Sequence, residues 1–357
     1  MKNKKFKNVL VVLGGTSGER AVSLESGRAC VKALKKKGYK VSLFDPKTKN
    51  FNLINKLKID VIFNALHGRD GEDGIAQSYF EYLKIPYTHS GVISSFNAMN
   101  KLISKDIFIK NNIKTPKFIS LKKTEYKTKI IQKIIKSKKI NYPIVLKPIN
   151  EGSSLGVEIC KNKEKLFKSS RYLFKKYDEL IIEEYIGGQE VQVAVINSDP
   201  LGAIELIPKR LFRSSSYLFK KYDELILEEY IGGQEVQVAV INSNPLGAIE
   251  LVPKRLFYDF KAKYTKKAKT KHVMPARLSK KKYKEVLEIA KKTHNILKCR
   301  GVTRSDFKFF NNIFYLLEIN TQPGMTSLSL VPEIANFKGL TFDNLIEKIL
   351  LDASVNK

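Results

Sequence analysis

The chain carries a tandem duplication, and this feature constrains its fold more than any other. Residues 168–212 read KSSRYLFKKYDELIIEEYIGGQEVQVAVINSDPLGAIELIPKRLF, and residues 213–257 repeat these 45 residues with five substitutions. Solenoid folds need several stacked repeats, whereas this segment occurs twice and is nearly identical. We therefore expect an ordinary globular architecture with one surplus segment, because removing one 45-residue copy from the 357-residue chain would leave 312 residues.

The two copies compete for one place in the predicted fold. Each encodes part of a helix, a strand ending in Glu-Glu-Tyr, a Gly-Gly turn and two further strands. The substitutions are too conservative to choose between the copies. Helix-like sequence precedes only the first copy, from Lys163 onward, so we favour that copy for the helix and the following strand. Either copy can supply the last strand, which leads into Tyr258.

The formal charge of +30 raises the question of a polyanionic partner. The lysines are spread through every segment, whereas binding to nucleic acid or to an anionic membrane depends on basic clusters. No stretch approaches the roughly 20 apolar residues that span a bilayer, and the N-terminus does not read as a signal peptide. The three cysteines and four histidines are scattered, which argues against a disulfide framework or a zinc centre. We expect a cytoplasmic protein with no nucleic-acid or membrane partner.

Two glycine-rich turns follow strands in the N-terminal region, where strand and helix patterns alternate as in an open α/β layer with parallel strands. The first turn reads Leu-Gly-Gly-Thr-Ser-Gly-Glu-Arg and contains Glu19, and it lacks the G-x-G-x-x-G dinucleotide pattern. The second, residues 64–74, contains His67 in His-Gly-Arg-Asp-Gly-Glu-Asp-Gly. Ligands bind outside the carboxyl ends of strands in such sheets, so both turns are candidate substrate sites. Ordinary turns remain the alternative.

A third motif has the composition of a phosphate-binding loop. A strand carrying Lys147 is followed by a loop with Ser153 and Ser154 and then by another strand. The N–H and hydroxyl donors of such a loop can fold over triphosphate oxygens while the lysine neutralises charge. A plain hairpin turn is the alternative, although turns seldom combine a lysine with Gly-Ser-Ser-x-Gly.

The strongest local pattern lies near the C-terminal end, in a strand-rich α+β region. Arg304 and Asp306 are two residues apart on one strand, and Glu318 and Asn320 are two apart on the next, so each pair shares a face. Side by side, the strands would present Asp306, Glu318 and Asn320 as oxygen ligands, which suits Mg²⁺ held partly by nucleotide phosphates. The alternate positions Phe307, Phe309, Leu317 and Ile319 are apolar, which argues against an exposed sheet.

Together these residues resemble the D-alanine–D-alanine ligases of the ATP-grasp superfamily, over essentially the whole chain apart from the surplus copy. Lys147, the Gly-Ser-Ser loop and the Asp-Glu-Asn set are similar to ATP-grasp enzymes in general. The two N-terminal motifs and Asn-Thr-x-Pro-Gly-Met-Thr-x-x-Ser-Leu at residues 320–330 are similar to this ligase in particular. The resemblance implies an ATP-grasp fold with a Rossmann-like α/β substrate domain (1–100), a lid domain (101–195) and a catalytic domain (196–352), with the duplication across the lid–catalytic boundary.

The same resemblance implies the reaction. ATP phosphorylates the carboxylate of one D-alanine, and the amine of a second D-alanine attacks the acyl phosphate, which gives D-alanyl-D-alanine for peptidoglycan synthesis. Two Mg²⁺ or Mn²⁺ ions and a homodimer are also implied. The implied substrate residues are Glu19, Ser153 and Tyr264 for orienting the first D-alanine, His67 for its carboxylate, Arg304 and the Gly324 N–H for the oxyanion, and Ser329 and Leu330 for the second carboxylate. Tyr264 further implies an amide product rather than an ester with D-lactate.

The implied nucleotide residues include one set that the duplication leaves open. Lys101, Lys147 and Ser154 would contact phosphates, and Lys263 the transferred phosphoryl group. The adenine hinge would be Glu183, Glu184 and Tyr185, with Glu190 on the ribose, but the second copy offers Glu228, Glu229, Tyr230 and Glu235 instead. Two alternatives remain: another ATP-grasp carboxylate–amine ligase, such as a glutathione-synthetase-like enzyme, and a relative that the duplication has inactivated.

Overall fold

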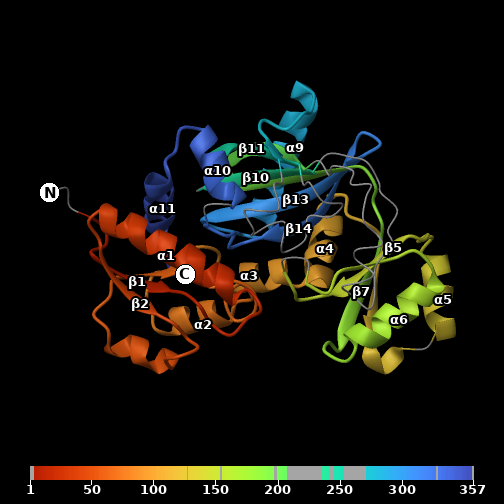
Figure 1. Ribbon diagram of the computed structural model, residues 1–357, viewed down its shortest axis with the longest axis horizontal. Coiled ribbons are helices and arrows are strands. Elements are labelled where there is room, and N and C mark those ends of the chain that lie inside the picture. Colours follow the sequence, from red (N-terminus) through yellow and green to blue (C-terminus); the bar gives the residue numbers. More distant parts are fainter. Residues whose placement is uncertain are drawn as a thin grey trace, which may run out of the picture.

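The computed structural model describes residues 4–126, 128–152, 155–196, 199–206, 235–241, 244–252, 271–326 and 329–355. Within these ranges the chain forms three sheets with helices packed on them (Figure 1). None of the described helices is long and apolar enough to cross a bilayer.

The N-terminal region is a parallel α/β layer, as predicted. Its central strand pairs in parallel with both neighbours, in the order β2-β1-β3. Strands β1 and β3 are almost entirely buried, which explains their continuous apolar sequence. The elements of this region are β1 (Asn8–Val12), α1 (Arg20–Lys36), β2 (Lys40–Phe44), the 3-10 helix η1 (Phe51–Lys56), β3 (Val61–Asn64), α2 (Ile75–Tyr82) and α3 (Val92–Met99).

Two helices, α3 and α4 (Lys101–Lys110), follow the N-terminal sheet, and they are separated at Asn100. The second, α4, begins after Asn100, whose side chain accepts hydrogen bonds from the N–H groups of Leu102 and Ile103. Such a cap satisfies donors that a helix start leaves unpaired. The break places Lys101 in the first turn of α4.

The second sheet is antiparallel, in the order β4-β7-β5-β6, and packs against α5 and α6. The strand β7 and the C-terminal half of α6 belong to the first copy of the repeated sequence, and the equivalent residues of the second copy lie outside the described residues. The elements are β4 (Phe118–Lys122), the 3-10 helix η2 (Lys123–Glu125), α5 (Thr128–Ser137), β5 (Ile144–Pro148), β6 (Glu158–Cys160), α6 (Lys163–Leu173) and β7 (Glu179–Glu184).

The third sheet carries the C-terminal half of the chain, and β13 and β14 form an antiparallel hairpin at one end of it. Its strand order over the described residues is β10-β11-β12-β9-β8-β13-β14. The elements are β8 (Gln189–Ile196), β9 (Asp199–Leu206), β10 (Glu235–Ile241), β11 (Asn244–Val252), β12 (Lys271–Val273), α9 (Lys280–Ile296), β13 (Val302–Phe310), β14 (Ile313–Asn320), α10 (Leu330–Phe337) and α11 (Phe342–Leu351).

Equivalent strands from the two copies reach the same part of this sheet. Strand β10 of the second copy pairs in parallel with β8 of the first copy. Each paired residue lies beside the residue that occupies the same position in the other copy, as Val236 lies beside Val191. Val302 and Thr303 of β13 pair with equivalent residues of both β8 and β10. The two copies therefore share one neighbour.

One hydrophobic core joins the N-terminal layer to the third sheet. It includes Val9 and Leu34 of the first region, Phe307 of β13 and Leu345 of α11. Helix α11 lies against α1 (Figure 1), and the ion pair Lys37–Glu347 (2.9 Å) adds to this contact. The continuous core holds the carboxyl ends of β1, β3 and β14 in fixed positions relative to one another.

Candidate active site

A cleft lies where the three regions meet. Its lining residues come from the turns after β1 and β3, from α4, from the loop after β5 and from the β13–β14 hairpin with the segment that follows it. The predicted residues that the structure brings together here are Glu19, His67, Lys101, Arg304, Glu318, Asn320 and Gly324. Sequence motifs separated by up to three hundred residues thus form one site.

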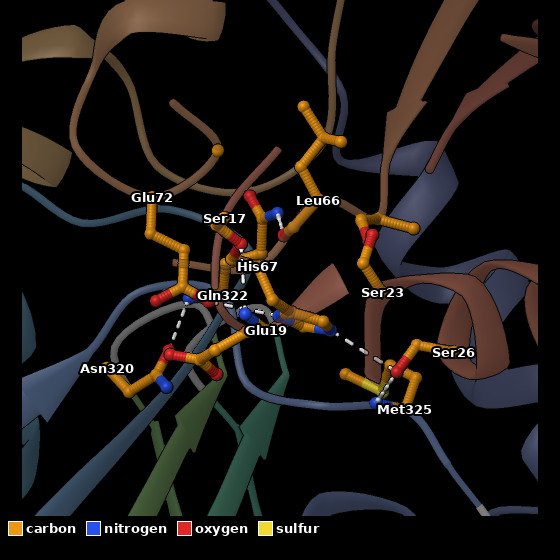
Figure 2. A network of polar contacts seen from close by, with 12 residues as sticks. Ser17, Glu19, Ser23, Ser26, Leu66, His67, Glu72, Asn320, Gln322 and Met325 are labelled. Carbon is orange, nitrogen blue, oxygen red and sulfur yellow. Dashed lines mark hydrogen bonds and ion pairs between the residues drawn. The ribbon is translucent and has the colours of Figure 1, made fainter. Parts of the chain in front are cut away.

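His67 lies in a hydrogen-bonded network on the N-terminal side of the cleft (Figure 2). Its Nδ1 is 2.9 Å from Oε1 of Glu72, and its Nε2 is 3.2 Å from Oγ of Ser26. Ser26 also accepts a hydrogen bond from the N–H of Met325 (3.1 Å). Burial raises the pKa of Glu72, and the hydrogen bond to His67 opposes that rise. The imidazole is therefore held firmly at the cleft wall.

Glu72 and Ser26 were not among the predicted site residues. Glu72 lies within the predicted His67 motif, so the motif itself carried the signal. Ser26 lies in the middle of α1, and its sequence context gives no such signal.

Glu19 is buried at the start of α1. Two of its implied partners, Ser153 and Tyr264, lie outside the described residues. The loop that leads to Ser153 nevertheless comes close, because a Cβ atom at Gly152 would lie 2.8 Å from Oε1 of Glu19. The backbone of this loop at Gly152 therefore lies beside the Glu19 carboxylate.

The predicted oxygen ligands share one face of the β13–β14 hairpin. Asp306 pairs directly with Glu318, and Arg304 pairs with Asn320. The Arg304 guanidinium donates to both Asp306 oxygens, from Nε at 2.9 Å and from Nη2 at 3.2 Å. No closed group of three or more acidic, histidine or cysteine ligands occurs in the described part of the chain. Two carboxylates and an amide fit Mg²⁺, which is usually held by one or two carboxylates together with substrate phosphates.

Lys101 lines the cleft, and two further buried lysines, Lys105 and Lys147, pair with Glu183; this group is called the lysine wall. Lys147 Nζ lies 2.9 Å from Oε2 of Glu183, and Lys105 Nζ lies 3.2 Å from its Oε1. Lys101 Nζ lies 3.6 Å from Oε2 of Glu318 and donates to the carbonyl of Glu151. Burial lowers the pKa of Lys101, because the charged form loses water.

Lys105 is the member of this wall that the sequence analysis missed. It is fully buried, donates to Oγ1 of Thr115 (2.6 Å), and has its pKa lowered by burial to about 8. Its signal was the four-residue spacing from Lys101, which places both lysines on one side of α4.

Glu183 receives the charge of two of these lysines. Burial alone would raise its pKa, but Lys105 and Lys147 outweigh that effect and lower it. The Lys105 contact lacks hydrogen-bond geometry, so Oε1 of Glu183 has no hydrogen-bond partner among the described residues. A buried carboxylate oxygen in this state can accept a hydrogen bond from a ligand.

The other implied nucleotide residues lie on or next to strands β7, β8 and β10. Glu184 ends β7, Tyr185 follows it, and Glu190 on β8 pairs with Lys308 (2.9 Å). Glu235 begins β10. The residues whose positions lie outside the described ranges are Ser154, Glu228, Glu229, Tyr230 and Lys263.

Ser329 and Leu330 lie at the start of α10. The Ser329 hydroxyl accepts a hydrogen bond from the N–H of Thr326 (3.0 Å), and a Cβ atom at Gly324 would lie 3.0 Å from that hydroxyl. Gly324 lines the cleft, whereas Ser329 lies just behind it. The turn after β14 therefore carries the implied oxyanion donor and the implied pocket for the second substrate side by side.

Comparisons with known proteins agree with this architecture. A family model described as the N-terminus of D-ala D-ala ligase matches residues 44–90, and one described as its C-terminus matches residues 107–212 and 209–351. A D-alanine–D-alanine ligase from Pelagibacter ubique is 48% identical over 351 residues, which cover 98% of this chain and 99% of that relative. One from Rickettsia bellii is 36% identical over 356 residues, covering 99% of this chain and 94% of the relative.

Solved structures give the same result. The crystal structure of a D-alanine–D-alanine ligase from Bacillus anthracis has a TM-score of 0.75 at 29% identity, covering 97% of each chain. A crystal structure of the Bacillus anthracis ligase complexed with ATP has a TM-score of 0.73 at 27% identity, again covering 97% of each chain.

Proposed function

The chain belongs to the D-alanine–D-alanine ligase family, and on this premise we propose how its cleft joins two molecules of D-alanine with ATP. The protein is an ATP-dependent ligase of the ATP-grasp type that makes D-alanyl-D-alanine for peptidoglycan synthesis. The observation that carries the proposed site is the meeting of Glu19, His67, Lys101, Arg304 and Glu318 in one cleft. These groups come from three regions of the chain, and each matches a separate part of the reaction.

The lysine-lined wall binds the nucleotide. Lys101 and Lys147 contact the phosphates, with help from Ser154 of the loop and from Lys263. Oε1 of Glu183 accepts a hydrogen bond from the adenine amino group, since it lacks another hydrogen-bond donor among the described residues. Glu184 and Tyr185 complete the hinge, and Glu190 contacts the ribose. The equivalent groups of the second copy, Glu228, Glu229, Tyr230 and Glu235, remain the alternative hinge.

Asp306, Glu318 and Asn320 would hold two Mg²⁺ or Mn²⁺ ions together with the phosphates. When bound, these ions neutralise charge on the phosphates. Arg304 keeps the Asp306 carboxylate oriented through its two hydrogen bonds. The position of Asn320 on the same face of the hairpin supports its assignment as the third ligand.

The wall formed by the turns after β1 and β3 binds the substrates. Glu19, Ser153 and Tyr264 orient the first D-alanine, and His67 faces its carboxylate. A carboxylate oxygen attacks the γ-phosphorus of ATP, which releases ADP and leaves an acyl phosphate. The amine of the second D-alanine, held at its carboxylate by Ser329 and Leu330, then attacks the acyl carbon.

The oxyanion formed by that attack accepts hydrogen bonds from Arg304 and from the Gly324 N–H. Phosphate leaves, and the amine loses a proton as the amide forms. Donors aimed at such an oxyanion contribute about a hundredfold or more to the rate.

Three further features are proposed on the resemblance and the sequence. The domains are 1–100, 101–195 and 196–352, the protein is a cytoplasmic homodimer, and one copy of the repeat is surplus. The shared pairing of β8 and β10 with Val302 and Thr303 supports competition between the copies.

The deciding experiment measures ADP release and dipeptide formation in the same samples, with Mg-ATP and with or without D-alanine. D-alanine should stimulate ADP release and dipeptide should appear. If neither occurs, the assay is repeated on a variant lacking residues 213–257, and restored activity would show that the duplication inactivates the chain. Continued inactivity would refute the functional assignment. Other amino acids and D-lactate as acceptors test the alternative ligase and the amide preference that Tyr264 implies.

A further inference from the structure

Gln322 joins two walls of the cleft that come from distant parts of the chain. It lies two residues after Asn320, is 1% exposed, and its backbone N–H donates to Oδ1 of Asn320 (2.8 Å). Its side chain crosses to the end of β3, where Oε1 accepts from Nδ2 of Asn64 (2.9 Å) and Nε2 donates to the carbonyl of Leu66 (Figure 2). One residue thus contacts a proposed metal ligand and the segment that leads into His67.

The segment reached by Gln322 is the His67 loop, residues 64–72, which carries His67 and Glu72. Asn64 at its start also donates to the carbonyl of Gly71 (3.2 Å), near its end. The side chain of Asn64 further accepts from the N–H of Leu66 (3.2 Å). Gln322 therefore holds the loop directly at Leu66 and, through Asn64, at Gly71.

The two carboxamide contacts require an amide at position 322. Asn64 offers a donor, so Gln322 must present an oxygen to it, and the Leu66 carbonyl requires a donor from the other end. A methionine of similar length would make neither bond. A glutamate would keep the acceptor but turn a carboxylate oxygen toward the Leu66 carbonyl.

We propose that Gln322 is a positioning residue that keeps the His67 loop in register with the metal-binding end of β14. This inference rests on the proposed function, because the register matters only if D-alanine binds near His67 and Mg-ATP near Asn320. Reacting groups held on separate elements lose about a hundredfold in rate when misplaced by about 1 Å. Removing the Gln322 side chain should therefore act on the D-alanine half of the reaction and leave nucleotide binding nearly intact.

Gln77 provides a matched control. It is also 1% exposed, and its Nε2 donates to the same Gly71 carbonyl (2.7 Å). It lies on α2, however, so it holds the loop from within the N-terminal region. Gln77→Met removes a comparable buried amide without cutting the link to β14.

The test compares the full-length wild type with Gln322→Met, Gln322→Glu and Gln77→Met. Steady-state kinetics give kcat and KM for each substrate, melting gives Tm, and hydrogen–deuterium exchange follows residues 64–72. For both Gln322 variants we expect kcat/KM for D-alanine to fall about 10- to 100-fold, as when a supporting residue of a metal site is lost. KM for ATP should change by less than about threefold, and the His67 loop should exchange faster.

For Gln77→Met we expect a lower Tm with kcat/KM for D-alanine within about threefold of wild type. Equal kinetic losses in Gln77→Met and Gln322→Met would overturn the inference, because both would then reflect a loosened loop. Unchanged kinetics in Gln322→Glu and Gln322→Met would also overturn it. If the wild type makes no dipeptide, the proposed function fails, and unchanged exchange at residues 64–72 in Gln322→Met would separately refute the register role.

Discussion

The two walls of the cleft are held together by different forces. On the substrate wall, neutral groups such as Asn64, Ser26 and Gln322 join the N-terminal region to the segment after β14 through hydrogen bonds. On the nucleotide wall, Lys105 and Lys147 are held by ion pairs to a buried carboxylate, with Lys101 beside them. The substrate wall is defined mainly by the directions of its hydrogen bonds. The nucleotide wall is defined mainly by its positive charge.

This difference matches what each wall is proposed to bind. Neutral hydrogen bonds fix geometry without the desolvation penalty of buried ions, and small substrates need accurate placement. Buried cations are unfavourable on their own, which is why burial lowers the pKa of Lys101 and Lys105. A triphosphate supplies the missing negative charge. The nucleotide wall is therefore prepared for a polyanion, whereas the hydrogen bonds of Asn64, Ser26 and Gln322 need no counter-charge.

The largest effect is expected at Lys147. Lys147→Met removes a proposed phosphate contact and one partner of the buried Glu183 carboxylate. Breaking a buried ion pair costs about 3–5 kcal/mol of stability, and loss of a charged group at the reacting phosphates should lower kcat by about 100- to 1,000-fold. Urea unfolding and steady-state kinetics measure the two effects.

Lys165 is the control for Lys147, because it pairs with Glu158 (2.8 Å) in the same region but is partly exposed. Lys165→Met should cost no more than about 1 kcal/mol and leave kcat unchanged. Similar losses in the two variants would remove the distinction between buried and surface charge on which the comparison depends.

Arg304 lies where the two walls meet, and Arg304→Lys should lower kcat by about a hundredfold. Lysine keeps the positive charge but cannot form the two-pronged contact with Asp306. KM for ATP should change less than kcat, because the substitution acts on the oxyanion and on the orientation of Asp306. A kcat within a factor of about two of wild type would show that charge alone suffices at this position.

The sequence predicted the local parts of this site but not the contacts between its walls. The alternation in Arg304-Ser-Asp306 and Glu318-Ile-Asn320 defines a strand face from neighbouring residues alone, and the register of β13 and β14 confirms that face. The contact between Asn64 and Gln322 joins residues 258 positions apart, so no local pattern specifies it. Lys105 was missed for a related reason. Its partner Glu183 lies on strand β7, far along the chain, and a lysine on a helix usually faces solvent.

The pH dependence of KM for ATP should also distinguish the two walls, with a smaller effect than the substitutions above. The pKa of Lys105 is lowered to about 8. Below that pH the Lys105 ammonium group is charged and pairs with the Glu183 carboxylate, and above that pH the charge is lost. KM for ATP should therefore rise severalfold between about pH 7 and pH 9, and Lys105→Arg should abolish the rise because arginine stays charged.

The free energy of unfolding should respond to Lys105 with the opposite sign. Between the folded pKa of about 8 and the ordinary value of 10.5, the unfolded state binds more protons, so the contribution of Lys105 to stability increases with pH. A KM for ATP that is flat with pH in the wild type would contradict the role assigned to this ion pair.

The smallest effect is expected at Ser26, which contributes one neutral hydroxyl to the substrate wall. Ser26→Ala leaves the Met325 N–H and Nε2 of His67 without this partner. A neutral hydrogen bond contributes about 0.5–1.5 kcal/mol, so kcat/KM for D-alanine should fall by about 2- to 10-fold with KM for ATP unchanged. A loss as large as that of Lys147→Met would mean that the neutral wall also depends on single contacts. A small loss would show that its geometry is shared among several bonds, whereas each charge on the nucleotide wall acts individually.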